Sequence, residues 1–569
     1  MASKITISKK IQIDNKWLLP MLHFLATFLF EKLTLIPKRA SEVFFSMPLS
    51  DRFSVKFEQV MTYSISKVLA AVIIFFLWKL VFWFISKESD KETRIIFGAL
   101  MAISVLSTIL LWPGVFEAGG DNCIPFSYAL RLMPEYWHGI YLSCLYTASV
   151  MVFPHAIAIN VLQTVLFVAV LGYVYNRIKK SEALQNVKWA RFLVLPMIIF
   201  ADSFTVATNP ERAEYNASLT LLFVSIVLFD ILEKRKRSNF ELISLLVFAG
   251  FLSVFRSEGI IVSILGFIAL LIFVYKPKLK DAAVLVIALL AVHFVLSLPA
   301  KVGNEKYYGS DYSIINSFNS LHNILCSDNT NLSYESVEKD LEAIGAITPI
   351  EVIKEFSGEG YRRLNFSKGY ADINQSRAGE EASEAFLAAY KNLVIHNLPI
   401  YIKTQWHMFL GAIEVKNSAY IEEYNGEGTD LPMFDRTLWS VGDADLQVIP
   451  GRYTWERIDS KNSLAALITI PRLKYIDFLK DSGIYTVLSV LELVASVVIV
   501  VSGIIKCFKK KFDEAGLAAI ALILDGYLLA MSLLMPVGAN MYYHAYIYCM
   551  YVVILCCSAA FINWRKNGR

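Results

Sequence analysis

Long apolar runs separated by short polar segments dominate the chain. A helix needs roughly 20 apolar residues to cross the hydrocarbon layer of a membrane, and shorter runs suffice when protein buries them. The weakest run, 17–36, ends in Glu31 and Lys32. This pattern predicts an all-α polytopic membrane protein of about 12 transmembrane helices. The apolar segments are 17–36, 60–86, 94–113, 156–176, 191–208, 214–232, 240–255, 259–275, 282–299, 482–506, 515–536 and 540–562.

One long segment breaks this pattern. Over residues 301–481 the apolar runs are short, and Asp, Glu, Asn and Gly return. The periodicity predicts helices over 334–356 and 379–395, an interfacial amphipathic helix over 399–414, and loop with short strands over 420–460. We therefore expect a mainly helical extracytoplasmic insert. The predicted division of the chain is 1–90 with two additional transmembrane helices, 91–300 as the main transmembrane module, 301–481 as the insert, and 482–569 as a C-terminal three-helix segment.

The positions of Lys and Arg predict the orientation, because cytoplasmic loops are rich in both. The apolar stretch 139–153 is short, and we expect a juxtamembrane or half-inserted helix there that does not cross. All positive clusters then fall on one side, so both termini are predicted to be cytoplasmic. The clusters are Lys87/Lys91/Arg94, Arg177/Lys179/Lys180, Lys234/Arg235/Lys236/Arg237, Lys276/Lys278/Lys280, Lys506/Lys509/Lys510/Lys511 and Arg565/Lys566/Arg569.

Composition supports the membrane assignment. Hydrophobic residues make up 56% of the chain and charged residues 18%, whereas a soluble protein carries about a quarter charged residues. The mean hydropathy is +0.49. A formal net charge of +4 gives no reason to expect nucleic acid as a partner. Of the seven cysteines, Cys123 and Cys326 fall in segments predicted to lie outside the membrane, where they could pair.

Three polar clusters are predicted at the outer face. Charged groups are costly near the centre of a membrane, so ionisable residues within the membrane are functional candidates by default. Each also has a structural alternative: a helix cap for Asp121, a local ion pair at the tight turn, and an ion pair at a helix break. The adjacent Trp137 and His138 suit an interfacial anchor or a substrate contact. The clusters are Glu117 with Asp121, then Glu211, Arg212 and Glu214, and finally Arg256 with Glu258.

This layout resembles the GT-C superfamily of membrane glycosyltransferases, particularly bacterial members that modify cell-surface glycans or lipids. The resemblance is carried by Trp112-Pro113-Gly114 followed by Asp121, by Tyr136-Trp137-His138-Gly139-Ile140-Tyr141, and by Phe153-Pro154-His155 with Asn160-Val161-Leu162-Gln163. Arg256-Ser257-Glu258-Gly259 matches a further Arg-x-acid-Gly element. The resemblance covers roughly residues 90–300 and extends less specifically into the insert. The second motif departs from the family pattern, because Glu211-Arg212-Ala213-Glu214 stands where Asp or Lys-Asp is more usual.

The resemblance implies a hexosyl or pentosyl transferase at the outer face of a bacterial plasma membrane. It would use a polyprenyl-phosphate-linked sugar as donor and a cell-surface glycan or lipid as acceptor. Asp121 would be the catalytic base, and Arg256 with Arg212 would hold the phosphate. Glu258, Glu211, Glu214 and Glu117 would orient Arg or bind sugar, with Trp137 and His138 as further substrate contacts. The scheme requires no cofactor, although a divalent cation (Mg or Mn) would fit the acids.

Other functions are also compatible with the sequence. A transporter or flippase of lipid-linked glycans would explain a helix broken at Arg256 to Gly259. A glycan polymerase would explain the large outer insert. A membrane scaffold that binds partners through the insert would leave the polar clusters without a role.

Overall fold

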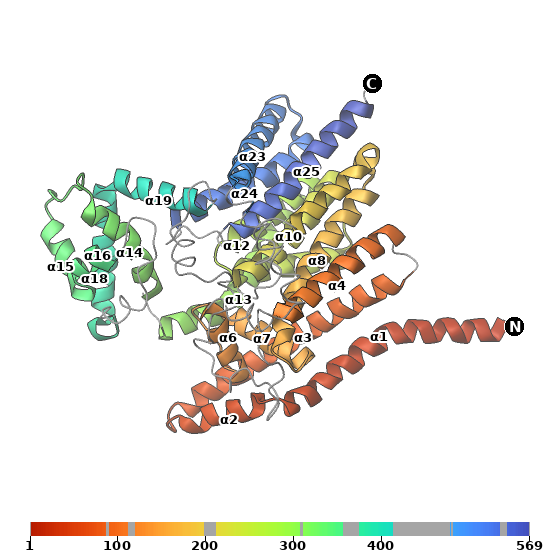
Figure 1. The fold of residues 1–569 in the computed structure, drawn as a ribbon, viewed down its shortest axis with the longest axis horizontal. Coiled ribbons are helices and arrows are strands. Elements are labelled where there is room, and N and C mark those ends of the chain that lie inside the picture. Colours follow the sequence, from red (N-terminus) through yellow and green to blue (C-terminus); the bar gives the residue numbers. More distant parts are fainter. Residues whose placement is uncertain are drawn as a thin grey trace. The chain divides into compact units, whose positions relative to one another are not determined.

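The computed structural model is built from helices, and the residues that it describes contain no strand (Figure 1). It describes residues 2–86, 90–111, 120–198, 212–307, 311–356, 375–412, 478, 482–534 and 543–567. Over these residues the prediction of a helical fold is confirmed. The predicted short strands over 420–460, the later part of 191–208 and the start of 540–562 lie outside the described residues.

The chain divides into two compact units. One comprises residues 1–222, 431–478 and 558–569, and the other comprises 223–430 and 479–557. Helices of the first unit are α1 (Ala2–Leu33), α2 (Ile36–Ser46), α3 (Arg52–Ile85), α4 (Lys91–Leu111), α6 (Gly120–Leu130), α7 (Ile140–Val152), α8 (Ile157–Lys180) and the 3-10 segment η1 (Glu182–Ile198). Helix α10 (Arg212–Glu233) begins in the first unit and ends in the second.

The second unit holds the remaining helices. They are α11 (Asn239–Phe255), α12 (Gly259–Leu270) with the π-turn η2 (Leu271–Tyr275), α13 (Leu279–Tyr307), α14 (Asp311–Cys326), α15 (Val337–Ile347), α16 (Ile350–Phe356), α18 (Gln375–His396), α19 (Leu398–Ala412), α23 (Ile484–Phe508), η3 (Phe512–Glu514) and α24 (Gly516–Leu534). The last helix, α25 (His544–Asn567), begins in the second unit and ends in the first.

Eight of the described helices are long and apolar enough to cross a membrane: α3, α4, α8, α10, α13, α23, α24 and α25. Helices α1 and α2 pass the same test as a pair bent by 55°, which makes up to nine spans. The pair α11 and α12–η2, predicted here as two spans, forms shorter apolar helices of 10–17 residues. The figure of twelve spans therefore stays a prediction, whereas the apolar helices indicate a membrane-embedded protein.

The bend between α1 and α2 has a local cause. Thr34 donates its hydroxyl to the Glu31 carbonyl and accepts the Ile36 backbone N–H at 3.3 Å. Pro37 lies in the first turn of α2, where proline is well tolerated because its missing N–H would have no partner there. The predicted run 17–36 therefore ends at the start of α2, which continues the chain in a new direction.

The core of the first unit lies between α1, α3, α7 and α8. Ala70 and Ile74 of α3 pack with Ala148 and Val152 of α7 and with Leu162 of α8. Small residues let these helices approach closely, which suits helix packing in a membrane. Helix α1 joins this core through a polar stripe of one residue every four positions: His23, Thr27 and Glu31.

Each side chain of the stripe on α1 has a partner. His23 bonds the Val152 carbonyl through Nε2 at 3.1 Å, while Trp78 donates to His23 Nδ1 at 3.2 Å. Lys67 of α3 lies 2.7 Å from a Glu31 carboxylate oxygen and 2.9 Å from the Thr27 hydroxyl. Its ammonium group also lies 3.9 Å from the centre of the Phe28 ring. The charged pair is therefore neutralised locally, inside the apolar α1–α3 interface.

In the second unit, glycines of α12 and α24 allow these helices to pack closely against α10. A Cβ atom on Gly266 of α12 would lie 2.9 Å from Phe223 of α10, and one on Gly516 of α24 would lie 2.6 Å from Ile231 of α10. At the C-terminal end of α10, the fully buried Asp230 pairs with Arg237. A capping box between Ser238 and Glu241 then starts α11. This hairpin carries a positive cluster that is predicted to face the cytoplasm.

The insert is a group of helices, α14, α15, α16 and α18, from which α19 leads to α24 (Figure 1). The predicted single helix over 334–356 is wrong, because Pro349 separates α15 from α16 and leaves Thr348 extended. Helix α19 contacts the C-terminal end of α24 through a bond from the Tyr401 hydroxyl to the Leu533 carbonyl at 2.8 Å. Its exposed Ile402 and Trp406 share one face, as expected of an amphipathic helix at an interface.

We predict that Lys67→Met destabilises the protein strongly. The Glu31 carboxylate would lose its cation in an apolar interface, and such a loss costs about 3–5 kcal/mol. Thermal unfolding in detergent, followed by tryptophan fluorescence, measures the effect. The double variant Lys67→Met/Glu31→Met should recover most of the loss, because it removes both charges. Lys56→Met, which changes an exposed lysine of the same helix, is the matched control. Equal unfolding temperatures for Lys67→Met and Lys56→Met would contradict the prediction.

Candidate functional site

The predicted catalytic residue, Asp121, lies in the first turn of α6. The N-terminal end of a helix carries partial positive charge, which favours a carboxylate there. The side chain of Asp121 lies outside the described part of the structure, and so do the whole of Glu117 and Glu211. Because α6 already begins at Gly120, Asp121 lies inside the helix and the prediction that it caps the helix is wrong. The catalytic interpretation stays a prediction.

A buried carboxylate organises the turn that contains Trp137 and His138. Glu135 is 1% exposed. It accepts the backbone N–H of Trp137 at 2.8 Å and that of His138 at 2.7 Å. The His138 ring Nδ1 lies 3.0 Å from the same carboxylate. An ionised carboxylate only accepts hydrogen bonds, so Glu135 fixes His138 with its proton on Nδ1. The structure thus brings two predicted contact residues together around a third residue that the sequence did not single out.

Helix α7 begins directly after this turn. Gly139, with φ of +98°, makes the entry, a backbone conformation that glycine adopts without strain. The Glu135 backbone N–H bonds the Ser143 hydroxyl at 3.2 Å and ties the turn to the helix. The 13 residues of α7 span about 20 Å at 1.5 Å per residue, which is shorter than the hydrocarbon layer. This length agrees with the predicted juxtamembrane helix.

The turn after α7 holds a second histidine. His155 accepts the Ile157 backbone N–H at Nδ1, 3.0 Å away, at the start of α8. Burial lowers the pKa of His155 to about 4. Its ring is therefore neutral at physiological pH and serves as a hydrogen-bonding group rather than as a cation.

The start of α10 carries the second predicted motif. Arg212 is half-buried, and Glu214 is 1% exposed in the first helical turn. The neighbouring Tyr215 donates its hydroxyl to the Ile159 carbonyl of α8 at 2.9 Å. Gln163 of α8 bonds the Ser218 hydroxyl at 3.1 Å one turn later. Helices α8 and α10 are thus joined by polar contacts directly behind the motif, which fixes the position of Glu214.

The third predicted motif, in the second unit, forms a buried ion pair. Helix α11 ends at Phe255, Arg256 is extended, and α12 starts at Gly259. The Arg256 guanidinium pairs with the Glu258 carboxylate, and their side chains are 6% and 9% exposed. The Ser257 hydroxyl donates to the other Glu258 oxygen at 2.9 Å. The sequence prediction that Arg256 and Glu258 act together is compatible with this contact.

Helix α24 covers this ion pair on one side. The buried Tyr527 lies within electrostatic reach of both Arg256 and Glu258. Removing a guanidinium and a carboxylate from water costs several kcal/mol for each ion, and their attraction does not always compensate. An apolar connection between α11 and α12 would avoid that cost. The pair is therefore a reasonable candidate for a binding role.

Sequence patterns missed several polar residues of the interior. Glu135 was overlooked because its role depends on backbone N–H groups, which no residue pattern displays. Glu492 in α23 and Asp525 in α24 were overlooked although each is a single acid within a long apolar run. That isolation is the signal that could have identified them, because acids in such runs are costly and usually functional.

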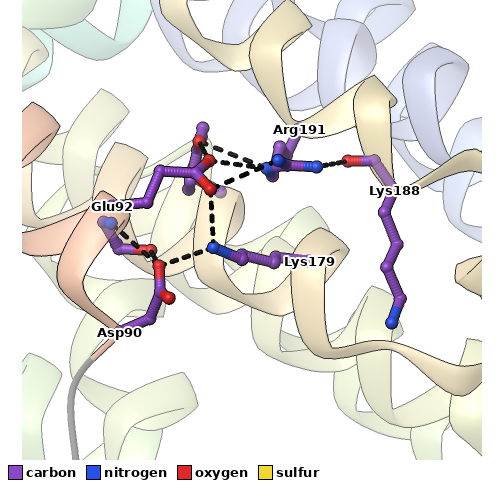
Figure 2. Close-up of polar contacts among 7 residues, drawn as sticks. Asp90, Glu92, Lys179, Lys188 and Arg191 are labelled. Atoms are coloured by element: carbon purple, nitrogen blue, oxygen red, sulfur yellow. Dashed lines mark hydrogen bonds and ion pairs between the residues drawn. The ribbon is translucent and has the colours of Figure 1, made fainter.

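A separate charged cluster lies where α4, α8 and η1 meet. Figure 2 shows Asp90 and Glu92 facing Lys179 and Arg191. Lys179 lies 2.9 Å from Glu92 and also pairs with Asp90, while Arg191 Nε lies 2.9 Å from Glu92. The ammonium group of Lys188 points away from the carboxylates (Figure 2), and this residue contributes its carbonyl to Arg191. The cluster lies at the predicted cytoplasmic ends of α4 and α8, where it holds the three elements together.

Among the described side chains, no group of three or more His, Cys, Asp and Glu is placed to hold a metal ion. Because the side chains of Asp121 and Glu211 are not described, the divalent cation stays a prediction. The same holds for a bond between Cys123 and Cys326: Cys326 is a free thiol in the structure, while the Cys123 side chain lies outside the described part.

Comparison with known proteins identifies no relative of this chain. A scan against models of protein families, a search of curated proteins and a search of solved structures each gave no match. The class of protein defined here therefore rests on the chain itself. Over the residues that the structure describes, it is helical throughout, apart from turns, and has eight helices, or nine with the bent pair, that could cross a membrane.

We predict that the cluster of Figure 2 stabilises the protein in a pH-dependent way. Hydrogen bonding to Lys179, and then to Thr93, lowers the pKa of Asp90 to about 2. A carboxyl with a lowered pKa in the folded state stabilises it above the unfolded pKa, near 4, and this contribution is lost as the pH falls toward 2. Asp90→Asn should lower Tm by roughly 2–4 °C at neutral pH.

The difference in Tm between the parent and Asp90→Asn should stay constant down to about pH 5 and shrink below about pH 4. Asp281→Asn, an exposed acid in the first turn of α13, is the control and should show no such trend. A difference that grows as the pH falls would contradict the assignment.

Proposed function

We propose that this protein is a membrane glycosyltransferase. It transfers a sugar from a polyprenyl-phosphate donor to a cell-surface glycan or lipid acceptor at the outer face of the plasma membrane. The observation that supports this most is the buried guanidinium of Arg256 at the break between two apolar helices. A guanidinium binds phosphate oxygens through two parallel hydrogen bonds, and a donor phosphate at the membrane surface would justify the cost of its burial.

In this scheme Asp121 accepts the proton of the attacking acceptor hydroxyl. Positive charge on Arg256, with Arg212 as a second cation, stabilises the phosphate that leaves the sugar. Glu258 holds Arg256 in place, as its ion pair suggests. Glu211, Glu214 and Glu117 remain proposed contacts of sugar hydroxyls. A single displacement by one base would invert the configuration at the sugar.

The turn formed by Glu135, Trp137 and His138 supports this proposal, because it holds two possible substrate-contacting side chains in fixed positions. Aromatic and imidazole rings commonly contact sugars, and here their backbone is clamped by a buried carboxylate. Such a clamp limits the movement of both rings, and a preorganised contact costs less entropy on binding. Trp137 and His138 are therefore proposed to contact the sugar or the lipid phosphate.

The proposed orientation places both termini in the cytoplasm and the insert outside, in a bacterial plasma membrane. The bond from Tyr401 to the end of α24 agrees with an insert that rests on the membrane surface. A transporter or flippase of lipid-linked glycans is the second candidate, because a charged break between α11 and α12 also suits that class. The two candidates differ in their chemistry: a glycosyltransferase cleaves the bond between sugar and phosphate in the donor, whereas a transporter leaves the donor intact.

We predict that the purified protein releases free polyprenyl phosphate from one polyprenyl-phosphate sugar when native membrane glycan is present. Asp121→Asn should slow this release by about 10²–10⁴-fold, because the acceptor loses its base. Asp328→Asn, which changes an exposed acid of the insert, should leave it unchanged. No release from any donor by a folded protein would favour the transporter. If Asp121→Asn still releases polyprenyl phosphate, the protein remains a glycosyltransferase but Asp121 is not its catalytic base.

We predict that Arg256→Lys weakens donor binding more than it slows the chemical step. Lysine keeps the charge but loses the planar fork, so KM for the donor should rise about tenfold. Arg212→Lys is the matched variant at the second proposed cation. Unfolding temperatures of both variants control for damage to the fold. An unchanged KM in Arg256→Lys with the parent's thermal stability would remove Arg256 from the donor site.

A further inference from the structure

The three C-terminal helices contain two acids that the proposed transfer reaction does not use. Glu492 is the sole acid of α23, and Asp525 is the sole acid of α24; α25 has none. Asp525 is at the middle of the 19 residues of α24, as far from its ends as that helix allows. All three helices are candidate membrane spans. Asp525 is therefore placed where a charge is most costly, and Glu492 also lies within an apolar candidate span.

Asp525 has polar neighbours on both flanking helices. It accepts the Tyr546 hydroxyl of α25 at 3.1 Å and also contacts the Ser496 hydroxyl of α23. Ser496 is 1% exposed. It lies four residues after Glu492, and residues with this spacing share one face of a helix. The face of α23 that carries Glu492 is thus turned toward Asp525 and Tyr546.

Close packing holds α23 in this orientation. A Cβ atom on Gly503 would lie 2.2 Å from the Cβ of Ala518, so α23 and α24 are in contact at their predicted cytoplasmic ends. The face of α23 opposite Ser496 is exposed at Leu491 and Val498, as expected for contact with lipid. Glu492 lies at the border of these two faces and is half-buried.

The Glu492 carboxyl has no cation near it in the described structure. Its Oε1 atom is buried and accepts no hydrogen bond from the described residues. The titratable groups that face it are Tyr546, Cys549 and Tyr551 of α25, with Asp525 behind Tyr546. None of these is positively charged. This contrasts with Lys67 and Glu31, where two opposite charges neutralise each other.

Placing a charged carboxylate at this position costs about 3 kcal/mol or more of free energy, and binding one proton removes that cost. We propose that Glu492, Asp525 and Tyr546 form an intramembrane proton-binding site in which Glu492 carries the proton as a neutral acid. Asp525 accepts the Tyr546 hydroxyl and is the second carboxyl of the site. The site is separate in sequence from every residue assigned to sugar transfer.

A lipid-soluble carbodiimide tests the proposal directly. It reacts with a carboxylic acid whose proton moves to a carbodiimide nitrogen while the carboxyl oxygen adds to the central carbon. The adduct rearranges to a stable N-acylurea with the mass of both reactants. Dicyclohexylcarbodiimide is incubated with the full-length protein in lipid vesicles, and peptide mass spectrometry locates the adduct. We expect Glu492 to be modified, with a rate that falls as the pH rises, because the neutral acid is the reactive form.

Matched controls separate a buried acid from an exposed one. Glu514, an exposed acid between α23 and α24 that pairs with Lys506 and Lys511, should react with a water-soluble carbodiimide, whereas Glu492 should not. Glu492→Gln should lose the adduct at 492 and keep a folded, monodisperse protein. Asp525→Asn should keep the adduct at 492, which tests whether Glu492 binds its own proton.

Three results would overturn the proposal. One is a Glu492 that the lipid-soluble reagent leaves unmodified at about pH 6 in a folded protein. Another is equal reaction of Glu492 and Glu514 with the water-soluble reagent, which would place the carboxyl in water. The third is protection of Glu492 by sodium ions at constant pH, which would make the site a metal-cation site. The readout does not use transferase activity, so it can fail or succeed independently of the proposed function.

Discussion

The need to neutralise charge inside apolar helices governs this structure. Without water, a buried ion must find its counter-ion, its hydrogen bonds or a proton within the protein. Lys67 and Glu31 show the first solution, because the pair joins α1 to α3 and is completed by Thr27 and by the Phe28 ring. The pair Asp230 and Arg237 repeats it at the hairpin between α10 and α11. These contacts fix which helix faces meet, a choice that apolar side chains alone would leave open.

The same constraint separates structural charges from candidates for function. Lys67, Glu31, Asp230 and Arg237 each connect two elements, so their contacts have a structural benefit. Arg256 and Glu258 lie two residues apart at one helix break, so their ion pair itself is local to the chain. A local pair of this kind gives little stability for the cost of its burial. A ligand that supplies further contacts, such as a phosphate, would account for its position.

Sequence reasoning located most helices because apolar runs of membrane length have few alternatives to a helix. It located the breaks less well. Pro349 divides a predicted helix into α15 and α16, and the first span bends at Thr34, close to Pro37, although both prolines are visible in the sequence. The candidate site was predicted only at the level of motifs. Arg256 with Glu258 followed from adjacent residues, whereas the clamp of Glu135 on His138 depends on how a backbone turn folds.

The hydrophobic pattern of the sequence also gave no indication that the acids of the C-terminal helices are important. Asp525 and Glu492 barely change the mean hydropathy of their helices, so each run still predicts a span, while the free energy of placing each acid is large. The two acids lie on different helices, and their proximity follows from packing at Gly503 and from the bond of Tyr546 to Asp525. A single ionisable residue in an apolar run therefore gives more information about function than the run itself, once a structure identifies the groups that face it.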